Sequence, residues 1–352
     1  MEDVVIGMRV LVTGNAGYIG PIVTRQLLDA GHEVTGFDSG LFDLEPVGSA
    51  SPEVTQIVKD IRDVDCSDVA GHDAIIHLAA LSNDPLGELN PGVTEAVNHE
   101  ATLSLAKIAK DAGVARFVFA GSCSAYGAGE PGEWLDESAP LRPQTAYARS
   151  KVEAENELVG MNCADFTTVL LRSATAYGAA PILRTDLVVN ELVARALIDG
   201  RVVLRTSGVQ WRPLVHVEDI ARAAVASLGA PHDDVGGRPF NVGSNHENYR
   251  VRDIADVVAD SVPGAKVIVA GDAEPDRRDY RVSFDRFEEV LPHATPQWTL
   301  ARGIAQLVEV FSSVGVSDAV IDRYSRVKHL KRLTEEGGLD ESVRLIEQTA
   351  HA

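Results

Sequence analysis

The stretch of sequence that decides the fold is Arg9-Val10-Leu11-Val12-Thr13-Gly14-Asn15-Ala16-Gly17-Tyr18-Ile19-Gly20. It begins with a short apolar run typical of a buried strand and ends where apolar residues start to recur at helical spacing. Gly14, Gly17 and Gly20 allow a tight turn, close helix–strand packing and the approach of backbone N–H groups to a diphosphate. Because similar turns also arise for packing alone, the interpretation depends on the rest of the chain.

Short apolar runs alternate with longer helical patterns over roughly the first half of the chain. After the first run they lie at residues 33–38, 54–58, 74–78, 116–120 and 167–171. They are rich in β-branched residues and largely free of charge, as expected of strands that helices cover on both faces. The alternation predicts an α/β fold with a doubly wound parallel (Rossmann) sheet.

An acidic residue, Asp38, closes the second predicted strand eighteen residues after Gly20. At this place a carboxylate can accept both hydroxyls of an adenosine ribose, and it would repel a 2′-phosphate. Loop and spacing together predict a dinucleotide site that takes NAD rather than NADP. The alternative is a solvated acidic turn residue.

The pattern loosens beyond Arg172, with helices expected at 186–199 and 217–228, a loop at 208–213 and a strand-like run at 239–242. We therefore predict three parts of the chain. Residues 1–174 form an NAD-binding Rossmann domain with returns from about 212–245, residues 175–322 form mainly a smaller, interleaved substrate-binding lobe, and residues 323–352 form a charged helical tail whose role is left open.

The composition excludes several classes of protein. The chain of 352 residues carries 52 Asp and Glu against 32 Lys and Arg, a net charge of −20, which argues against nucleic acid and anionic membranes as partners. No apolar run approaches the roughly 18 residues of a membrane span, and the first residues are too acidic for a signal peptide. Cys66, Cys123 and Cys163 lack metal-like spacing, which indicates a cytoplasmic protein without a metal site.

Tyr147 and Lys151 stand four residues apart, on one face of a predicted helix. This pair suits proton transfer to or from a sugar hydroxyl while a hydride moves to or from a nicotinamide. Since a free phenol has a pKa of about 10, we expect Lys151 and the nicotinamide cation to lower it toward the working range. Ser122, which follows an earlier strand, can hydrogen-bond the same oxygen. The alternative is an exposed Tyr and Lys on a helix.

With these motifs, the sequence from about Arg9 to Leu300 resembles extended short-chain dehydrogenases/reductases of the NAD-dependent nucleotide-sugar epimerase/dehydratase family. The family's catalytic residue stands four positions before a Tyr-Gly, as Ser122 does before Tyr126. Further segments that match family motifs are Asp60-Ile61, His77-Leu78-Ala79-Ala80, Asn98, Arg172 to Gly178, and Arg212 ahead of His216-Val217-Glu218-Asp219.

The motifs and the resemblance together imply a set of site residues. The expected catalytic residues are Ser122, Tyr147 and Lys151. The expected cofactor-binding residues are Gly14, Ala16, Gly17, Tyr18, Ile19, Gly20, Asp38, Ser39, Asp60, Ile61, Leu78, Ala79, Ala80, Asn98, Tyr147, Lys151 and Ala174. The expected substrate-binding residues are Ser82, Asn83, Ser124, Thr175, Tyr177, Arg212, Arg277 and Arg278.

Two departures from the family pattern bear on the reaction and the substrate. The 4,6-dehydratases of the family have Asp-Glu directly after the catalytic residue, whereas this chain has Cys123 and Ser124, which disfavours dehydration. An Asn that usually binds substrate is replaced by Thr175, which indicates an atypical sugar or nucleotide.

Some of the site residues also have simpler interpretations. Arg212, with Arg277 or Arg278, can clamp the two charges of a nucleoside diphosphate, and exposed ion pairs are the alternative for the last two. Tyr177 is expected beside the nicotinamide or sugar, with core packing as the alternative.

Three further residues are expected to be structural. We interpret His77 and His216 as hydrogen-bonded structural histidines and Cys123 as a small packed residue.

The predicted activity is that of an NAD-dependent nucleotide-sugar 4-epimerase acting through a 4-keto intermediate, with a nucleoside-diphosphate sugar as substrate. A reductase or dehydrogenase for NDP-4-ketosugars, and an epimerase acting at C2, would use the same residues. A non-catalytic NAD-sensing protein is the alternative of another class.

In the family, helices matching residues 97–112 and 147–158 usually form a dimer interface, so a homodimer is expected, with core packing as the alternative.

Overall fold

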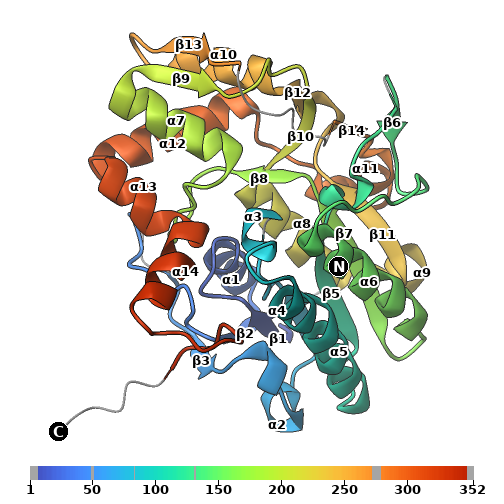
Figure 1. Cartoon of the computed structure of the whole chain (residues 1–352). Helices are drawn as coiled ribbons and strands as arrows, with labels where there is room; N and C mark the ends of the chain where they lie inside the picture. The colour runs from blue at the N-terminus through green and yellow to red at the C-terminus, as the bar shows by residue number, and fades with distance from the viewer. Residues whose placement is uncertain (1–6, 49–50, 83, 131, 272–278, 347–352) are drawn as a thin grey trace, which may run out of the picture.

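The main sheet of the protein has seven strands in the order β11-β7-β5-β4-β1-β2-β3, and every neighbouring pair is parallel (Figure 1). The computed structural model describes residues 7–48, 51–82, 84–130, 132–271 and 279–346. The strands are β1 (Arg9–Thr13), β2 (Glu33–Asp38), β3 (Thr55–Val58), β4 (Ala74–His77), β5 (Arg116–Ser122), β7 (Thr167–Ser173) and β11 (Arg238–Val242). The strand order reverses between β1 and β4, which confirms the predicted doubly wound sheet.

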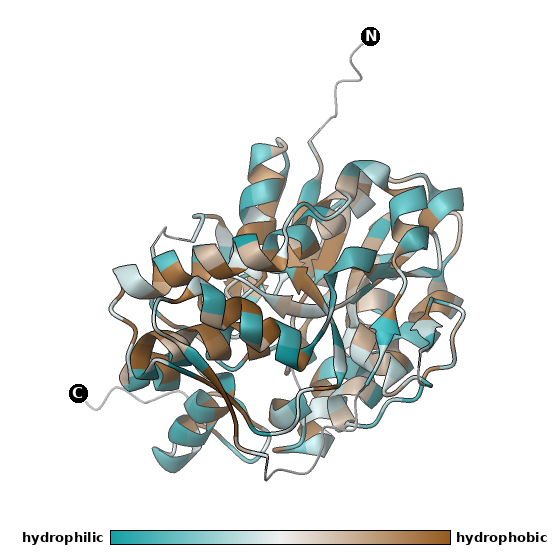
Figure 2. Cartoon of the chain, turned by 90° about the horizontal axis from the view of Figure 1, so that it is seen from above, coloured by the Kyte–Doolittle hydropathy of each residue, from teal (hydrophilic) through white to brown (hydrophobic). Residues whose placement is uncertain are grey.

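Helices cover both faces of this sheet. They include α1 (Gly20–Asp29), α2 (Cys66–Val69), α3 (Asp84–Gly87), α4 (Pro91–Glu95), α5 (Ala101–Asp111), α6 (Ala146–Met161), α8 (Val217–Gly229), α9 (His232–Val235) and α11 (Asp285–Val290). Val10 and Val12 of β1 pack with α1 and α8, whereas Leu11 packs with α5 and α6 on the other face. Both faces are therefore buried, which explains why the strands read as uninterrupted apolar runs. Figure 2 shows the apolar residues gathered in the interior.

The remaining elements lie above the main sheet in the view of Figure 1, and most of them share a second core, whereas β6 and β14 pack against the core of the main sheet. They comprise β8 (Thr175–Tyr177), β10 (Trp211–His216) and β12 (Asn248–Arg250) in one sheet, β9 (Arg201–Leu204) with β13 (Lys266–Val269), β6 (Trp134–Leu135) with β14 (Arg281–Val282), and the helices α7 (Val188–Asp199), α10 (Val251–Ser261) and α12 (Leu300–Ser313). The loop expected at 208–213 ends earlier than predicted, because residues 211–213 pair with β12.

The chain ends in two helices, α13 (Asp318–Tyr324) and α14 (Arg326–Glu335). After α14 it turns back, and Leu339 and Leu345 form an isolated antiparallel bridge. Among the described residues no single helix is long and apolar enough to cross a membrane; α12 and α13 reach that length only together, across a bend of 114°.

Candidate active site

A cavity of about 850 Å³ lies at the carboxyl ends of the central strands. Ligands of doubly wound sheets bind at this edge, where the strand order reverses. The turns after β1, β4 and β5, the end of β2 and the first turns of α6 line one side of the cavity. Residues of α7, β10 and α14 line the other side.

The glycine turn after β1 has the shape that an approaching ligand requires. Gly14 has a φ of +74°, and a Cβ atom added to it would lie 2.7 Å from the backbone N of Ala79. A Cβ atom on Gly20 would lie 2.4 Å from Asn15, so a side chain is excluded there as well. No side chain caps the N-terminus of α1, and Gly17 to Gly20 line the cavity. Pro21 has no N–H group, and those of Ile22 and Val23 donate to the carbonyl O of Ile19, so the N–H groups that suit a diphosphate here are those of the turn leading into the helix.

Asp38 lies at the end of β2 and lines the cavity together with Ser39. Its carboxylate accepts hydrogen bonds from the backbone N of Gly40 at 2.9 Å and of Ala16 at 3.2 Å. Burial raises the pKa of Asp38, and these two hydrogen bonds oppose the shift. Ala16 itself does not line the cavity. Its backbone amide acts on the site by orienting the carboxylate of Asp38.

Asp60 and Ile61 follow β3 and also line the cavity. The Asp60 carboxylate accepts from Arg62 Nε at 2.8 Å and from its Nη2 at 2.6 Å. This bidentate pair holds the turn after β3 beside the end of β2, where the resemblance places the adenine side of the cofactor.

Asn98 is the clearest correction among the predicted cofactor residues, because it does not line the cavity. It is fully buried in a π turn (Ala96–Glu100) that joins α4 to α5, so the helix begins at Pro91 rather than near residue 97. Its side chain accepts from Leu81 N at 2.8 Å and donates to Leu81 O at 3.1 Å. Asn98 thus fixes the turn after β4, whose residues Leu78, Ala79 and Ala80 do line the cavity.

Ser122, Tyr147 and Lys151 all line the same cavity as the glycine turn. Ser122 ends β5, and Tyr147 is in the first turn of α6, whose N-cap residue Thr145 accepts from Ala148 N at 3.1 Å. The Ser122 hydroxyl faces the phenol closely enough to act on its pKa. Lys151 lies one turn further along α6, and its Nζ is 4.6 Å from the centre of the Phe119 ring.

The pKa values of this pair differ from the simple expectation. Burial, and then the carboxylate of Asp84, raise the pKa of Tyr147 to about 12, although Ser122 opposes the shift. Burial lowers the pKa of Lys151 to about 7. The expectation that Lys151 brings the phenol into the working range is therefore not met by the chain alone, because burial disfavours the charged form of both groups.

The predicted substrate-binding residues fall into three groups. Those that line the cavity are Ser82, Ser124, Thr175 and Arg212. Those that lie outside the described residues are Asn83, Arg277 and Arg278. Tyr177 is corrected to a core residue: it is 1% exposed, does not line the cavity, and packs edge-on to the ring of His216 at 5.3 Å. It sits at the end of β8, facing the second core rather than the cavity.

The two histidines have the structural roles predicted for them. His77 is fully buried, with Nδ1 2.7 Å from Thr13 Oγ1 and Nε2 2.8 Å from Thr102 Oγ1. His216 caps α8 and has its Nε2 2.9 Å from Gln306 Oε1. Burial lowers the pKa of His77 to about 3 and that of His216 to about 4, so both rings are neutral at physiological pH.

Several charged residues of the cavity wall were not singled out in the sequence, among them Arg184, Asp186 and Arg326. Arg184 is buried and donates to Ser82 O at 2.9 Å and to Asp186 at 3.2 Å. None of them belongs to a spaced motif, and Arg326 comes from the tail, more than 280 residues after Asp38 in the sequence. Only the acidic balance of the chain hinted that cations would be needed beside an anionic ligand.

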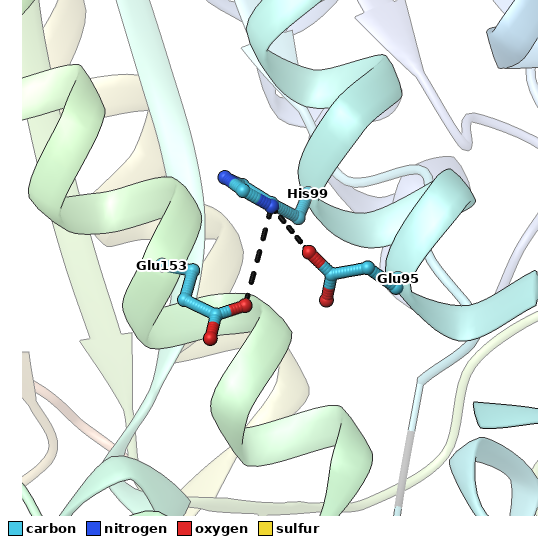
Figure 3. A group of neighbouring side chains, drawn as sticks. All are labelled: Glu95, His99 and Glu153. Atoms are coloured by element: carbon cyan, nitrogen blue, oxygen red, sulfur yellow. Dashed lines mark hydrogen bonds and ion pairs between the residues drawn. The ribbon is translucent and has the colours of Figure 1, made fainter. Parts of the chain in front are cut away.

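One group outside the cavity has the side chains of a metal site: Glu95, His99 and Glu153 (Figure 3). His99 contacts Glu95 through Nδ1, and its Nε2 lies 2.9 Å from Glu157. Burial lowers the pKa of His99, but the hydrogen bonds to Glu157 and Glu95 outweigh it and raise the pKa overall. An imidazolium surrounded by carboxylates accounts for this group as an ion-pair cluster that joins α4 and the π turn after it to α6.

Comparisons with known proteins show what the chain is similar to. The sequence matches the NAD dependent epimerase/dehydratase family over residues 10–243. A UDP-glucose 4-epimerase of Mycolicibacterium smegmatis is 31% identical over 320 residues, which cover 86% of this chain and 98% of that protein. A dTDP-glucose 4,6-dehydratase of Streptomyces griseus is 29% identical over 314 residues, covering 85% and 93%. The structure of DesIV, a dTDP-glucose 4,6-dehydratase of Streptomyces venezuelae with NAD bound, matches with a TM-score of 0.75 at 28% identity, covering 87% of this chain and 97% of that one.

Proposed function

The chain belongs to the NAD-dependent epimerase/dehydratase family, with NAD as its cofactor, and we propose that it is a nucleotide-sugar 4-epimerase. One observation carries the proposal: the groups for hydride and proton transfer line the cavity, whereas the acid–base pair for water elimination is missing beside them. Ser122, Tyr147 and Lys151 supply the first set.

The positions of the elimination pair hold Cys123 and Ser124. Cys123 is 1% exposed and does not line the cavity, and its thiol lies 3.1 Å from the carbonyl O of Arg172. Burial raises the pKa of the Cys123 thiol, so it is protonated at neutral pH. Ser124 lines the cavity, but a hydroxyl is neither an acid nor a base at this pH. Epimerisation needs no such pair.

The chain fits NAD at three places. The turn at Gly14 leaves no room for a Cβ atom, the turn leading into α1 offers N–H groups, and Asp38 presents a carboxylate for ribose hydroxyls. NAD, when bound, would supply a hydride acceptor and donor and a positive charge at its nicotinamide ring.

The protein's own part in the reaction is to move one proton twice. The phenolate of Tyr147 would accept the proton of the 4-hydroxyl as C4 is oxidised, and would return it when the ketone is reduced on its other face. Ser122 would donate a hydrogen bond to the same oxygen. Lys151 would hold the cofactor ribose and, when protonated, favour the phenolate. Closure of the cavity keeps the 4-keto sugar from escaping between the two halves of the reaction.

A nucleoside diphosphate fits the part of the cavity beyond Tyr147. Arg205, Arg212 and Thr175 all line the cavity and would face the phosphates there. In a chain of net charge −20, placed guanidinium groups are the natural partners of two phosphate charges. This supports a nucleoside-diphosphate sugar as substrate.

The experiment that tests the proposal starts with denaturing the purified protein and identifying released NAD by mass spectrometry. The intact protein is then offered UDP-, GDP-, CDP-, ADP- and dTDP-sugars without added cofactor. A C4 epimer formed without net change at 340 nm supports the proposal. Dependence on stoichiometric NAD(P)H would instead indicate a reductase. A product epimerised at C2 would indicate a C2-epimerase, and loss of water from the sugar would indicate a dehydratase.

A further inference from the structure

The C-terminal segment, residues 325–346, packs over the end of the cavity formed by β2 and β3 (Figure 1). His329 of α14 has its Nε2 3.0 Å from the carbonyl O of Leu41, and its ring centre lies 5.6 Å from that of Phe42. Leu330 and Leu339 share an apolar cluster with residues of the turn after β4 and of α3 and α4, namely Leu81, Leu86 and Val93. The segment is thus attached to two turns that line the cavity.

The last part of the segment is attached to the turn after β3. The carbonyl O of Ser342 accepts from Arg62 Nη1 at 2.8 Å, and Arg344 pairs with Asp63. Val343 lies between these contacts, lines the cavity, and has a φ of +59°, the only positive φ of a non-glycine in the part of the chain that the structure describes. A β-branched residue adopts this conformation only where its surroundings hold it, so the segment is held against the cavity.

Arg326, at the start of α14, is a buried cation of the cavity wall. It is 3% exposed, and its guanidinium carbon lies 4.3 Å from the centre of the Phe42 ring. Its Nη1 is buried and has no hydrogen-bond acceptor among the described residues. A buried guanidinium with an unused donor is costly for the folded chain unless an anion completes the site.

The charges around Arg326 show where such an anion would lie. Asp38 and Asp186 are near enough to attract the guanidinium, and Arg184 is near enough to repel it. Burial, together with Arg184, lowers the pKa of Arg326 to about 9, so the group stays charged at neutral pH. Arg184 is already hydrogen-bonded to Ser82 and Asp186. Of these two guanidinium groups, the one with an unused hydrogen-bond donor is therefore that of Arg326.

We propose that residues 325–346 form a strap over the adenosine half of the NAD site and that Arg326 binds the diphosphate of the cofactor. The diphosphate is the anionic part of NAD, and it lies between the ribose that Asp38 would hold and the nicotinamide end at Tyr147. The N-terminal end of α1 would meet the two phosphate charges from one side of the cavity, and the guanidinium of Arg326 would add a positive charge from another. The proposal depends on the cofactor alone and holds whichever carbon of the sugar reacts.

The test compares full-length protein with the variant Arg326→Gln. Bound NAD is exchanged against isotopically labelled NAD and followed by mass spectrometry, and displacement by ADP and by adenosine is measured separately. We expect roughly 10- to 100-fold faster release of NAD and weaker binding of ADP by a similar factor, because a charge-assisted hydrogen bond is lost. Adenosine, which has no phosphate, should bind about as well as to the unchanged protein.

Lys331→Gln is the matched control, because Lys331 is exposed on the same helix and the substitution removes the same charge. It should leave exchange unchanged. If Arg326→Gln weakens ADP and adenosine equally, or lowers the thermal stability of the NAD-free protein without changing the stabilisation by NAD, Arg326 is only a structural counter-ion and the proposal fails. If Arg326→Gln does not fold, Arg326→Lys takes its place, with intermediate NAD exchange expected and unchanged exchange counting against the proposal.

Hydrogen exchange tests the strap itself. Binding of NAD to the unchanged protein should slow amide exchange in residues 325–346 at least several-fold, and Arg326→Gln should reduce this protection. Equal exchange with and without NAD would overturn the strap, even if the arginine contributes to binding.

Discussion

Two buried cations line the cavity at the two ends of the proposed NAD site, and each lies against a phenylalanine ring. Lys151 is 4.6 Å from the ring centre of Phe119 near the catalytic phenol, and Arg326 is 4.3 Å from that of Phe42 near the ribose-side carboxylate. Burial lowers the pKa of Lys151 to about 7 but that of Arg326 only to about 9. One end can therefore exchange protons near neutral pH, while the other keeps a permanent charge. We call the part of the site around Tyr147 and Lys151 the catalytic end, where a substitution should reduce turnover. We call the part around Asp38 and Arg326 the holding end, where a substitution should weaken binding of the cofactor.

The largest effect is expected at the catalytic end. Tyr147→Phe removes the group that would carry the proton, so turnover should fall by roughly 100- to 10,000-fold. The NAD content of the purified protein should stay the same, because the phenol oxygen is not needed to hold the dinucleotide. Product formation by chromatography and NAD released on denaturation are the two measurements.

Tyr177→Phe is the matched control for this prediction. The Tyr177 hydroxyl is buried without a partner among the described residues and does not line the cavity. Its removal should leave turnover and NAD content unchanged. Equal losses in the two variants would mean that removal of a phenol acts on packing rather than on the reaction, and the separation of the two ends would not hold.

The same two ends show what the sequence could predict. Some site residues stand at spacings along the chain that nucleotide binding and proton transfer require, and such spacings can be seen in the sequence alone. These residues are Gly14, Asp38, Tyr147 and Lys151. All four line the cavity. The parallel sheet was equally readable, because its inner strands, such as β1 and β4, are buried on both faces and show no alternation of polar and apolar residues.

Residues that act through tertiary packing could not be predicted in the same way. Arg326 reaches the cavity from the end of the chain through contacts of α14 with Phe42 and Leu41, and no local pattern announces that contact. Asn98 and Tyr177 matched motif positions, yet a π turn and the packing of β8 direct them away from the cavity. A sequence motif identifies which residues are present, but the direction in which their side chains point depends on the tertiary packing.

A smaller effect is expected at the holding end from Asp38→Ala. Loss of the carboxylate removes hydrogen bonds to the ribose hydroxyls and also the repulsion of a 2′-phosphate, so the preference for NAD over NADP should fall by roughly 10- to 100-fold. Titration of both dinucleotides measures the ratio. The rate per bound NAD should stay within a few-fold, because Tyr147 is untouched. An unchanged NAD/NADP ratio would remove Asp38 from the ribose site.

The last prediction concerns stability and tests the buried lysine directly. Lys151 has a pKa of about 7 in the folded protein, against about 10.4 in an unfolded chain. Between these values the unfolded chain binds more protons, so the lysine adds stability as the pH rises, by about 1.4 kcal/mol per unit, and adds none of this dependence below pH 7.

Denaturant unfolding of NAD-free protein between about pH 6 and 9.5 would measure this contribution as the difference between the unchanged chain and Lys151→Met. Above about pH 10 the raised pKa of Tyr147 works in the opposite direction, since the unfolded phenol ionises first. Lys107→Met, at an exposed position of α5, is the matched control and should leave the pH dependence unchanged. A slope that survives in Lys151→Met would show that the lysine stays charged in the folded protein. The catalytic and holding ends would then both carry permanent cations, and the proton-exchanging character of the catalytic end would have to come from the bound cofactor alone.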